Sequence, residues 1–133
     1  VLFSLPGAFT PTCSSQQLPG YESRYEDLKK LVDEVYCLSV NDAFVMNAWF
    51  RDQNISKVKP IGDGEGRFTE GMGMLVKKPK QGFGLRSWRY SALIDDCKVI
   101  KQFVEDGKND DSKDDDPFKV SDVETMLKYL KKN

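Results

Sequence analysis

The order of apolar segments along the chain is what most limits its possible folds. Residues 1–5 form a short, nearly continuous apolar run that Pro6 and Gly7 end, and residues 35–40 form a second compact run rich in β-forming side chains. Such runs are typical of strands buried on both faces of a sheet. Between them, apolar residues recur at helical spacing over 21–32, with charged residues in the intervening positions. This order predicts an α/β fold.

The next part of the chain adds further elements and a change of strand direction. Residues 43–50 are expected to form a short helix, and residues 58–61 are a weaker strand candidate that is followed by the glycine-rich turn 62–66. Residues 87–94 and 98–104 flank Asp95 and Asp96, a pattern that predicts a hairpin of two antiparallel strands.

The C-terminal region combines an acidic segment with an amphipathic pattern. Residues 105–116 include seven acidic residues and few apolar ones, which predicts a solvated loop, and they lack the spacing of a calcium-binding EF-hand. Ser121 and Glu124 match a capping box ahead of a helix over 123–130. We therefore expect one domain over 1–133, with a thioredoxin-like, three-layer α/β fold in which helices flank a central mixed sheet.

Charge and composition exclude several classes of function. The chain has 20 basic and 21 acidic residues and a net charge of −1, so no broad positive field would attract nucleic acid. It contains no histidine, which excludes Ser-His-Asp and Cys-His catalytic sets and histidine-ligated zinc. No apolar run approaches the ~20 residues that cross a bilayer, so no membrane association is expected.

The three cysteines point to a reducing compartment. Cys13, Cys37 and Cys97 lie far apart in the sequence and form no CxxC pair. An odd number at such spacing indicates neither a disulfide framework nor a dithiol oxidoreductase. We therefore expect a cytoplasmic protein.

Cys13 is the strongest candidate nucleophile. It falls where a helix is expected to begin, and the free N–H groups of a helix N-terminus stabilise a thiolate. Pro6 and Thr10 precede it as P-x-x-x-T-x-x-C, which places a hydroxyl about one helical turn before the sulfur. The alternative interpretation of an isolated cysteine is a small buried core residue.

The string 6–14, Pro-Gly-Ala-Phe-Thr-Pro-Thr-Cys-Ser, resembles the active-site motif of the peroxiredoxins. Residues 39–42, 44–46, 63–64 and 82–91 are similar to the type II, or peroxiredoxin-five, branch. Within that branch, the chain looks most like the bacterial form that is fused to glutaredoxin or works with it. The resemblance extends from residue 1 to about residue 130 and weakens across the acidic segment.

The resemblance implies a role for each residue of the motif. Cys13 would be the peroxidatic cysteine, Thr10 would hydrogen-bond the sulfur and the peroxide, and Pro6 would shield the site. Arg89, in the string Trp-Arg-Tyr-Ser, would hold the thiolate and the substrate oxygens. Taken alone, Arg89 could equally be a strand arginine paired with a surface carboxylate, Thr10 a helix cap and Pro6 a strand stop.

The chain departs from the family pattern in several places. Gln17 stands where members of this branch commonly have a histidine, so proton handling near the site is expected to differ. No cysteine follows Cys97, which excludes a resolving cysteine near the C-terminus. Cys37 lies where plant-like members carry a second cysteine, so it is either a resolving residue or a core residue of a strand. The N-terminal hairpin of the family is missing, and a shortened N-terminus is the simplest account.

These features predict a peroxidase that reduces hydrogen peroxide and organic hydroperoxides through a sulfenic acid on Cys13. An external thiol would regenerate it, and the resemblance implies glutathione followed by glutaredoxin, with thioredoxin as an alternative. No metal or prosthetic group is expected. A non-catalytic peroxide sensor or chaperone, and a thioredoxin-dependent two-cysteine peroxidase using Cys37, are the competing hypotheses. A homodimer is expected. Four aromatic residues flank the site and are either core residues or part of an interface: Phe44, Trp49, Phe83 and Trp88.

Overall fold

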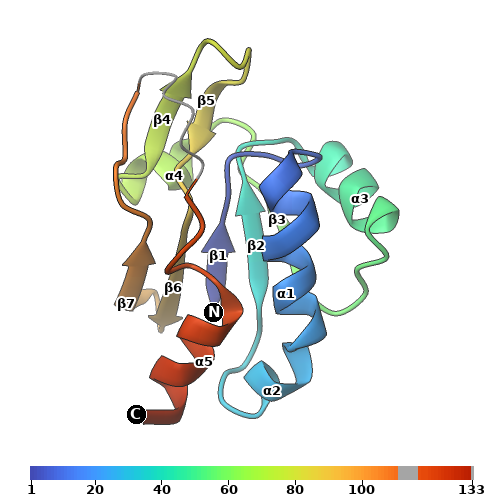
Figure 1. The fold of residues 1–133 in the computed structure, drawn as a ribbon, viewed down its shortest axis with the longest axis vertical. Helices are drawn as coiled ribbons and strands as arrows, with labels where there is room; N and C mark the ends of the chain where they lie inside the picture. Colours follow the sequence, from blue (N-terminus) through green and yellow to red (C-terminus); the bar gives the residue numbers. More distant parts are fainter. Residues whose placement is uncertain (111–116, 133) are drawn as a thin grey trace.

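The computed structural model describes residues 1–110 and 117–132. Its main feature is a five-stranded sheet with the strand order β3-β2-β1-β6-β7 (Figure 1). The strands are β1 (Leu2–Ser4), β2 (Tyr36–Ser39), β3 (Lys59–Gly62), β6 (Tyr90–Asp95) and β7 (Lys98–Val104).

Strand β1 lies at the centre of the sheet and is buried along its whole length. It pairs in parallel with β2, and β2 pairs in parallel with β3. On its other side, β1 pairs with β6 in the antiparallel direction, and β6 and β7 form the expected antiparallel hairpin. The predicted mixed sheet is therefore confirmed.

Side chains on the two faces of the sheet belong to two separate cores. Phe3 and Cys37 point to the face covered by the helices, where they pack in one cluster with Leu18, Trp49 and Met126. The helices are η1 (Cys13–Gln17, a π-helical turn), α1 (Leu18–Ser23), α2 (Tyr25–Lys29), α3 (Ala43–Asp52), α4 (Arg67–Gly71) and α5 (Val123–Lys132). Of these, η1, α1, α2, α3 and α5 contribute to the helix-side cluster.

The opposite face is covered by a small second sheet, which sequence reasoning did not predict. Strands β4 (Leu75–Lys78) and β5 (Gly84–Ser87) form an antiparallel pair. Val76 of β4 packs with Leu38 and Tyr90 of the main sheet. The predicted single strand over 87–94 is wrong, because the chain leaves the small sheet after β5 and enters the main sheet only at β6.

The helical segment that begins at Cys13 continues through Pro19 and breaks at Arg24, between α1 and α2. One prediction about a helix end is wrong. The capping box predicted from Ser121 does not form, because α5 begins at Val123 and Asp122 therefore precedes the helix; the Ser121 hydroxyl donates to Glu105. Asp122 caps the helix instead, accepting hydrogen bonds from the backbone N–H and the hydroxyl of Thr125.

The acidic segment is only partly the solvated loop that was predicted. Glu105 is 2% exposed. Its carboxylate accepts hydrogen bonds from the backbone N–H groups of Lys119, Val120 and Ser121 and from the Ser121 hydroxyl. Residues 111–116 lie outside the described part of the chain. The segment around Glu105 is thus an anchor for the chain that leads into α5.

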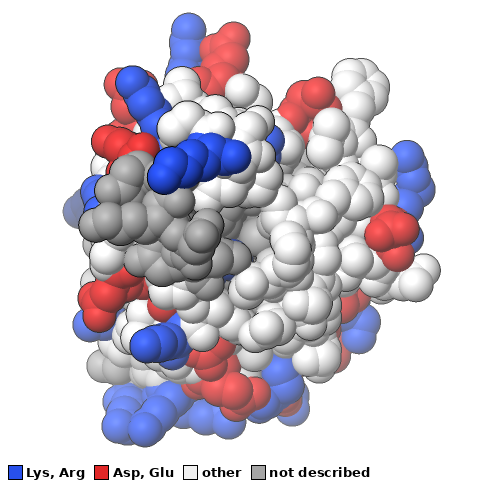
Figure 2. All heavy atoms as spheres, turned by 45° about the horizontal axis from the view of Figure 1, so that its top comes forward, with Lys and Arg blue, Asp and Glu red and all other residues white. Residues whose placement is uncertain are grey.

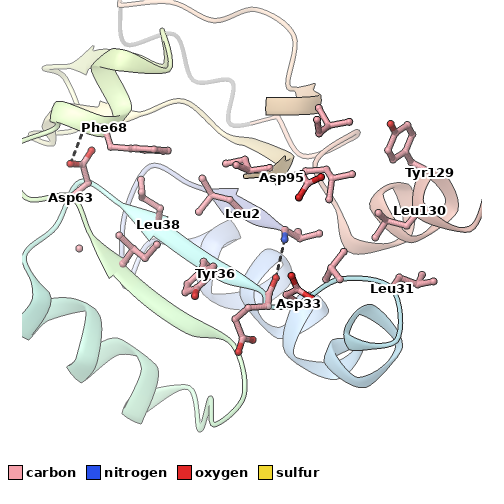
Figure 3. A pocket seen from close by; sticks show the side chains of 18 residues that line it. Leu2, Leu31, Asp33, Tyr36, Leu38, Asp63, Phe68, Asp95, Tyr129 and Leu130 are labelled. Atoms are coloured by element: carbon pink, nitrogen blue, oxygen red, sulfur yellow. Dashed lines mark hydrogen bonds between the residues drawn. The ribbon is translucent and has the colours of Figure 1, made fainter. Parts of the chain in front are cut away.

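A hollow of about 990 Å³ lies on the face of the main sheet that the helix-side core does not cover (Figure 3). Leu2 and Leu38 form part of its floor, Phe68 of α4 lies at one end, and Tyr129 and Leu130 of α5 lie at the other. The residues lining it do not include Cys13. No helix within 1–110 and 117–132 is long and apolar enough to cross a membrane.

Candidate active site

The loop between β1 and the first helical turn carries the predicted motif. The Leu5 N–H donates to the Leu38 carbonyl, which extends the pairing of β1 with β2 by one residue. The Ala8 N–H then donates to Asn41 Oδ1 at 3.0 Å, so the end of β2 holds the middle of the loop. Phe9 adopts a left-handed backbone conformation with φ 64° and is 54% exposed. The turn at Phe9 directs the following residues into the helix.

Thr10 and Cys13 lie within one helical turn, as the motif predicts. The Ser14 N–H donates to the Thr10 carbonyl at 3.0 Å, closing the turn around Cys13. The Thr10 hydroxyl donates to the Gly7 carbonyl at 2.7 Å. Because its proton is used in that bond, the Thr10 oxygen faces any substrate as an acceptor.

A tryptophan of a neighbouring helix fixes the same turn. The Trp49 indole N–H donates to Ser14 Oγ at 2.9 Å, and Trp49 is fully buried beneath it. Cys13 is itself 0% exposed. The sulfur therefore lies below the protein surface, at a helix start that both backbone and side-chain bonds hold in place.

Arg89 brings a positive charge to this buried sulfur. Its guanidinium nitrogen Nη1 donates to Cys13 Sγ at 3.4 Å, and the residue is 1% exposed. The same nitrogen donates to the side-chain oxygen of Gln17. The predicted association of Arg89 with Cys13 is present in the structure, although the two residues are 76 positions apart.

The buried Glu105 and its partners support Arg89. The Glu105 N–H donates to the Arg89 carbonyl at 3.2 Å, which fixes the backbone just before β6. The segment that the Glu105 carboxylate holds also carries Phe118, whose ring lies 5.8 Å from the centre of the Arg89 guanidinium. An aromatic ring at this distance attracts a cation, so the segment contributes to the position of the guanidinium.

Burial alone would raise the pKa of the Glu105 carboxyl. The hydrogen bonds from Ser121, Lys119 and Val120 favour the charged form and outweigh burial, so the pKa is lowered overall. Glu105 is therefore a charged anchor at neutral pH.

Arg86 is a residue near the site that sequence reasoning missed. It lies on β5, where its side chain donates to the Phe83 carbonyl at 3.0 Å and to the Pro6 carbonyl at 3.4 Å. A Cβ atom on Gly7 would lie 2.7 Å from its Nη1, so glycine at this position leaves room for the guanidinium. The only signal in the sequence was a second arginine three positions before Arg89.

Arg86 also acts electrostatically on the site. Partial burial lowers the pKa of its guanidinium, and the interaction with Cys13 raises it. Arg86 thus links the β4–β5 hairpin to the loop before Cys13 and adds a second cation near the sulfur.

The other two cysteines differ sharply in their surroundings. Cys37 lies on β2 and is 0% exposed, as expected for a core residue. Burial raises the pKa of its thiol well above the usual value; Cys13 also raises it, and Arg89 lowers it. Cys97 is exposed, in the turn between β6 and β7. Neither environment favours a reactive thiolate in the way that the site around Cys13 does.

The structure therefore unites most of the predicted site. Cys13, Thr10 and Arg89 lie together, and the Pro6 carbonyl is bound by Arg86 at the start of the same loop. Gln17, noted in the sequence only as a departure from a pattern, contacts Arg89 directly. A buried thiol beside a fixed guanidinium can attack an electrophile whose leaving atom gains negative charge. Within the described residues, no group of three or more His, Cys, Asp or Glu side chains could hold a metal ion.

The face that carries the loop and the start of α3 is broadly uncharged (Figure 2). This face corresponds to the top of Figure 1, brought forward, and most of its charged side chains lie toward the edges. Phe9 and Phe44, which belong to the loop and to the first turn of α3, are 54% and 86% exposed. Two large apolar side chains near the ends of the site's loop and α3 are therefore exposed.

Comparisons with known proteins show which family the chain resembles. The family model named Redoxin matches residues 1–127. The chain is 56% identical to a peroxiredoxin of Synechocystis, over 98% of the chain and 69% of that protein. It is 55% identical to the hybrid peroxiredoxin hyPrx5 of Haemophilus influenzae, over 98% of the chain and 52% of that protein. The crystal structure of a Plasmodium falciparum antioxidant protein, a 1-Cys peroxiredoxin, is 40% identical with a TM-score of 0.92, over 99% of the chain and 77% of that structure.

Proposed function

Because the chain belongs to the peroxiredoxin family and is therefore a thiol-dependent peroxidase, we propose that Cys13 is its peroxidatic residue and that glutathione and glutaredoxin regenerate it. The observation that carries the proposal is the 3.4 Å contact between Arg89 Nη1 and Cys13 Sγ, with both residues buried. A fixed guanidinium beside the sulfur, in a site from which water is excluded, attracts the negative charge that moves from the sulfur to the peroxide during attack.

The first step is the attack of the thiolate on a hydroperoxide. Cys13 Sγ forms a bond to one peroxide oxygen, the O–O bond breaks, and the other oxygen leaves as hydroxide or alkoxide, which takes up a proton. The sulfur is oxidised to a sulfenic acid, and the peroxide is reduced to water or an alcohol.

Arg89 and Thr10 contribute to this step in different ways. Charge moves from the sulfur to the leaving oxygen, so a donor that can reach both atoms stabilises the transition state more than the ground state. Arg89 Nη1 already lies at the sulfur. The Thr10 hydroxyl donates to the Gly7 carbonyl, so its oxygen can accept a hydrogen bond from the O–H of the hydroperoxide and orient it.

The second step regenerates Cys13. A glutathione thiol condenses with the sulfenic acid to give a mixed disulfide and water, and a second thiol then releases Cys13 and forms oxidised glutathione. The buried Cys37, whose thiol is held in the neutral form, is a poor resolving residue, which favours an external thiol. The hybrid name of the Haemophilus relative and the 1-Cys name of the Plasmodium structure support the same proposal.

The proposal is tested by turnover with two defined reducing systems. Peroxide consumption is followed with glutathione, glutaredoxin and glutathione reductase, and separately with thioredoxin and thioredoxin reductase. We expect sustained turnover with the glutathione system and its loss in Cys13→Ser. Sustained turnover only with thioredoxin would overturn the choice of reductant, and a single oxidation without turnover in either system would favour a peroxide sensor.

Cysteine variants test whether one cysteine is sufficient. Cys37→Ser removes a buried thiol and Cys97→Ser removes an exposed one, and we expect both variants to retain glutathione-driven turnover. If Cys37→Ser is folded but as inactive as Cys13→Ser, the enzyme uses two cysteines.

We also propose that the uncharged face around Phe44 forms a homodimer interface. The Phe44 side chain is 86% exposed and that of Phe9, in the loop before Cys13, is 54% exposed; exposed aromatic side chains favour a partner surface that covers them. Sedimentation analysis should give a dimer for the parent chain and a monomer for Phe44→Glu. A monomeric parent at micromolar concentration would contradict the proposal.

A further inference from the structure

Gln17 occupies an unusual position at the site. It is 1% exposed and lies on the same π-helical turn as Cys13. Its side-chain oxygen accepts a hydrogen bond from Arg89 Nη1, the nitrogen that also donates to Cys13 Sγ. A guanidinium has only donors, so the amide oxygen must be the atom that faces it. A single nitrogen of Arg89 therefore connects the glutamine with the sulfur.

The other half of the same amide argues against a role in packing alone. Gln17 Nε2 is buried and has no hydrogen-bond partner among the residues described. A buried donor without a partner destabilises the folded protein, and a methionine or leucine of similar size would avoid that cost. The contribution of the amide is therefore the acceptor that it presents to Arg89.

The charge of this acceptor matters for the chemistry. The charged and titratable groups around the site come from several elements: Arg89, before β6, donates to both Gln17 and Cys13, and Arg86 on β5 and Cys37 on β2 interact electrostatically with Cys13. A carboxylate at position 17 would pair with Arg89 and offset the charge that acts on the sulfur. An amide binds the guanidinium without offsetting its charge, and an amide does not titrate.

We propose that Gln17 is a positioning residue that fixes Arg89 against Cys13 through a neutral acceptor, leaving the full guanidinium charge to the thiolate and the peroxide. The inference rests on the proposed roles of Cys13 and Arg89. It assigns a function to a side chain that touches neither the sulfur nor, by itself, the substrate.

The test compares two substitutions of Gln17 with the same substitutions of its exposed neighbour Gln16. Gln17→Glu keeps the shape and adds a charge, and Gln17→Met keeps the size and removes the acceptor. The readout is the rate at which iodoacetamide alkylates Cys13 as a function of pH, with the alkylated residue identified by mass spectrometry. The rate constant for oxidation by hydrogen peroxide is measured on the same samples.

We expect Gln17→Glu to raise the pH midpoint of Cys13 alkylation by about one unit. Gln17→Met should slow oxidation by about tenfold because Arg89 is no longer held in place. Gln16→Glu and Gln16→Met should match the parent chain. A general loss of packing would lower stability without moving the alkylation midpoint.

Two results would overturn the inference: an alkylation midpoint for Gln17→Glu equal to that of Gln16→Glu, or a parent-like oxidation rate in Gln17→Met. If Gln17→Glu does not fold, the oxidation rate of Gln17→Met decides the matter. Failure of the proposed function can be distinguished from failure of this inference. In the first case Cys13 of the parent chain would not react with peroxide, and the alkylation midpoints of the Gln17 variants would still test the role of Gln17.

Discussion

The anchor at Glu105 can be tested by replacing its carboxylate with an amide. Glu105 Oε1 accepts only the Lys119 N–H, and Oε2 accepts the three bonds from Val120 and Ser121. In Glu105→Gln the NH₂ group takes the place of Oε1, so the Lys119 N–H meets a donor in place of an acceptor. The other three hydrogen bonds are then made to a neutral amide oxygen instead of a charged carboxylate oxygen. Bonds to a charged group contribute about 1 kcal/mol more than neutral ones, so four bonds predict a loss of about 4 kcal/mol in the free energy of unfolding.

Urea unfolding at several pH values measures this loss. Folding lowers the pKa of Glu105 below its ordinary 4.5, so its stabilisation is fully present above that pH and is lost as the pH falls through the lowered value. The difference in stability between parent and variant should therefore be complete at pH 7 and shrink below about pH 4.5. Glu70→Gln, at an exposed position, serves as the control and should resemble the parent.

The link from Glu105 to Arg89 gives the same variant a second readout. Because the anchored segment carries Phe118 against the Arg89 guanidinium, Glu105→Gln should also slow the oxidation of Cys13. A loss of less than about 1 kcal/mol at pH 7 would refute the reasoning, because it would mean that the four bonds are replaced at no cost.

Three further predictions concern the site itself. Arg89→Met should slow peroxide oxidation of Cys13 in stopped-flow measurements by about two orders of magnitude, the scale of losing an electrostatic donor, and an unchanged rate would remove Arg89 from the site. Cys37→Ser should retain glutathione-driven turnover, measured by NADPH consumption, since its thiol is buried and neutral; loss of turnover in the folded variant would contradict this. Gly7→Ala and Arg86→Met should each slow oxidation by about fivefold, equivalent to about 1 kcal/mol. The double variant should be no slower than either single variant, because both changes break the same contact, between the Arg86 guanidinium and the loop at Gly7. Additive effects would show that Gly7 and Arg86 act separately.

The parts of the fold that could be predicted from the sequence depend on local signals. The buried run at β1 and the hairpin of β6 and β7 have clear apolar patterns and turn residues. The small sheet lacked such a signal, because β4 has only four residues, two of them lysines, and its burial comes from contact with the main sheet. Tertiary contact, which a local pattern does not contain, decides such strands.

The capping box shows the same limit at a single residue. Ser121 has a suitable local sequence for a helix cap, yet its hydroxyl donates to Glu105, 16 positions earlier in the chain. The helix begins at Val123, one residue later than the capping box requires, and the Ser121 hydroxyl and N–H both donate to the buried carboxylate. Asp122 then supplies the cap from the next position.

The residues of the site also differ in whether the local sequence could predict their positions. Cys13 and Thr10 belong to one short motif, so their proximity follows from helix geometry once the helix start is known. Arg89 was predicted only through the resemblance of its surrounding residues to a family. The contacts of Gln17 and Arg86 depend on how distant elements pack, and the sequence contained no local reason to place either beside Arg89 or Pro6.

The central claim is that Cys13 is oxidised by peroxide and regenerated through glutathione. Mass spectrometry of the protein after one equivalent of hydrogen peroxide, with and without glutathione, tests it most directly. The account predicts a sulfenic acid on Cys13 that becomes a glutathione adduct, with Cys37 unmodified. A disulfide between Cys13 and Cys37, or a Cys13 that remains unmodified, would contradict it.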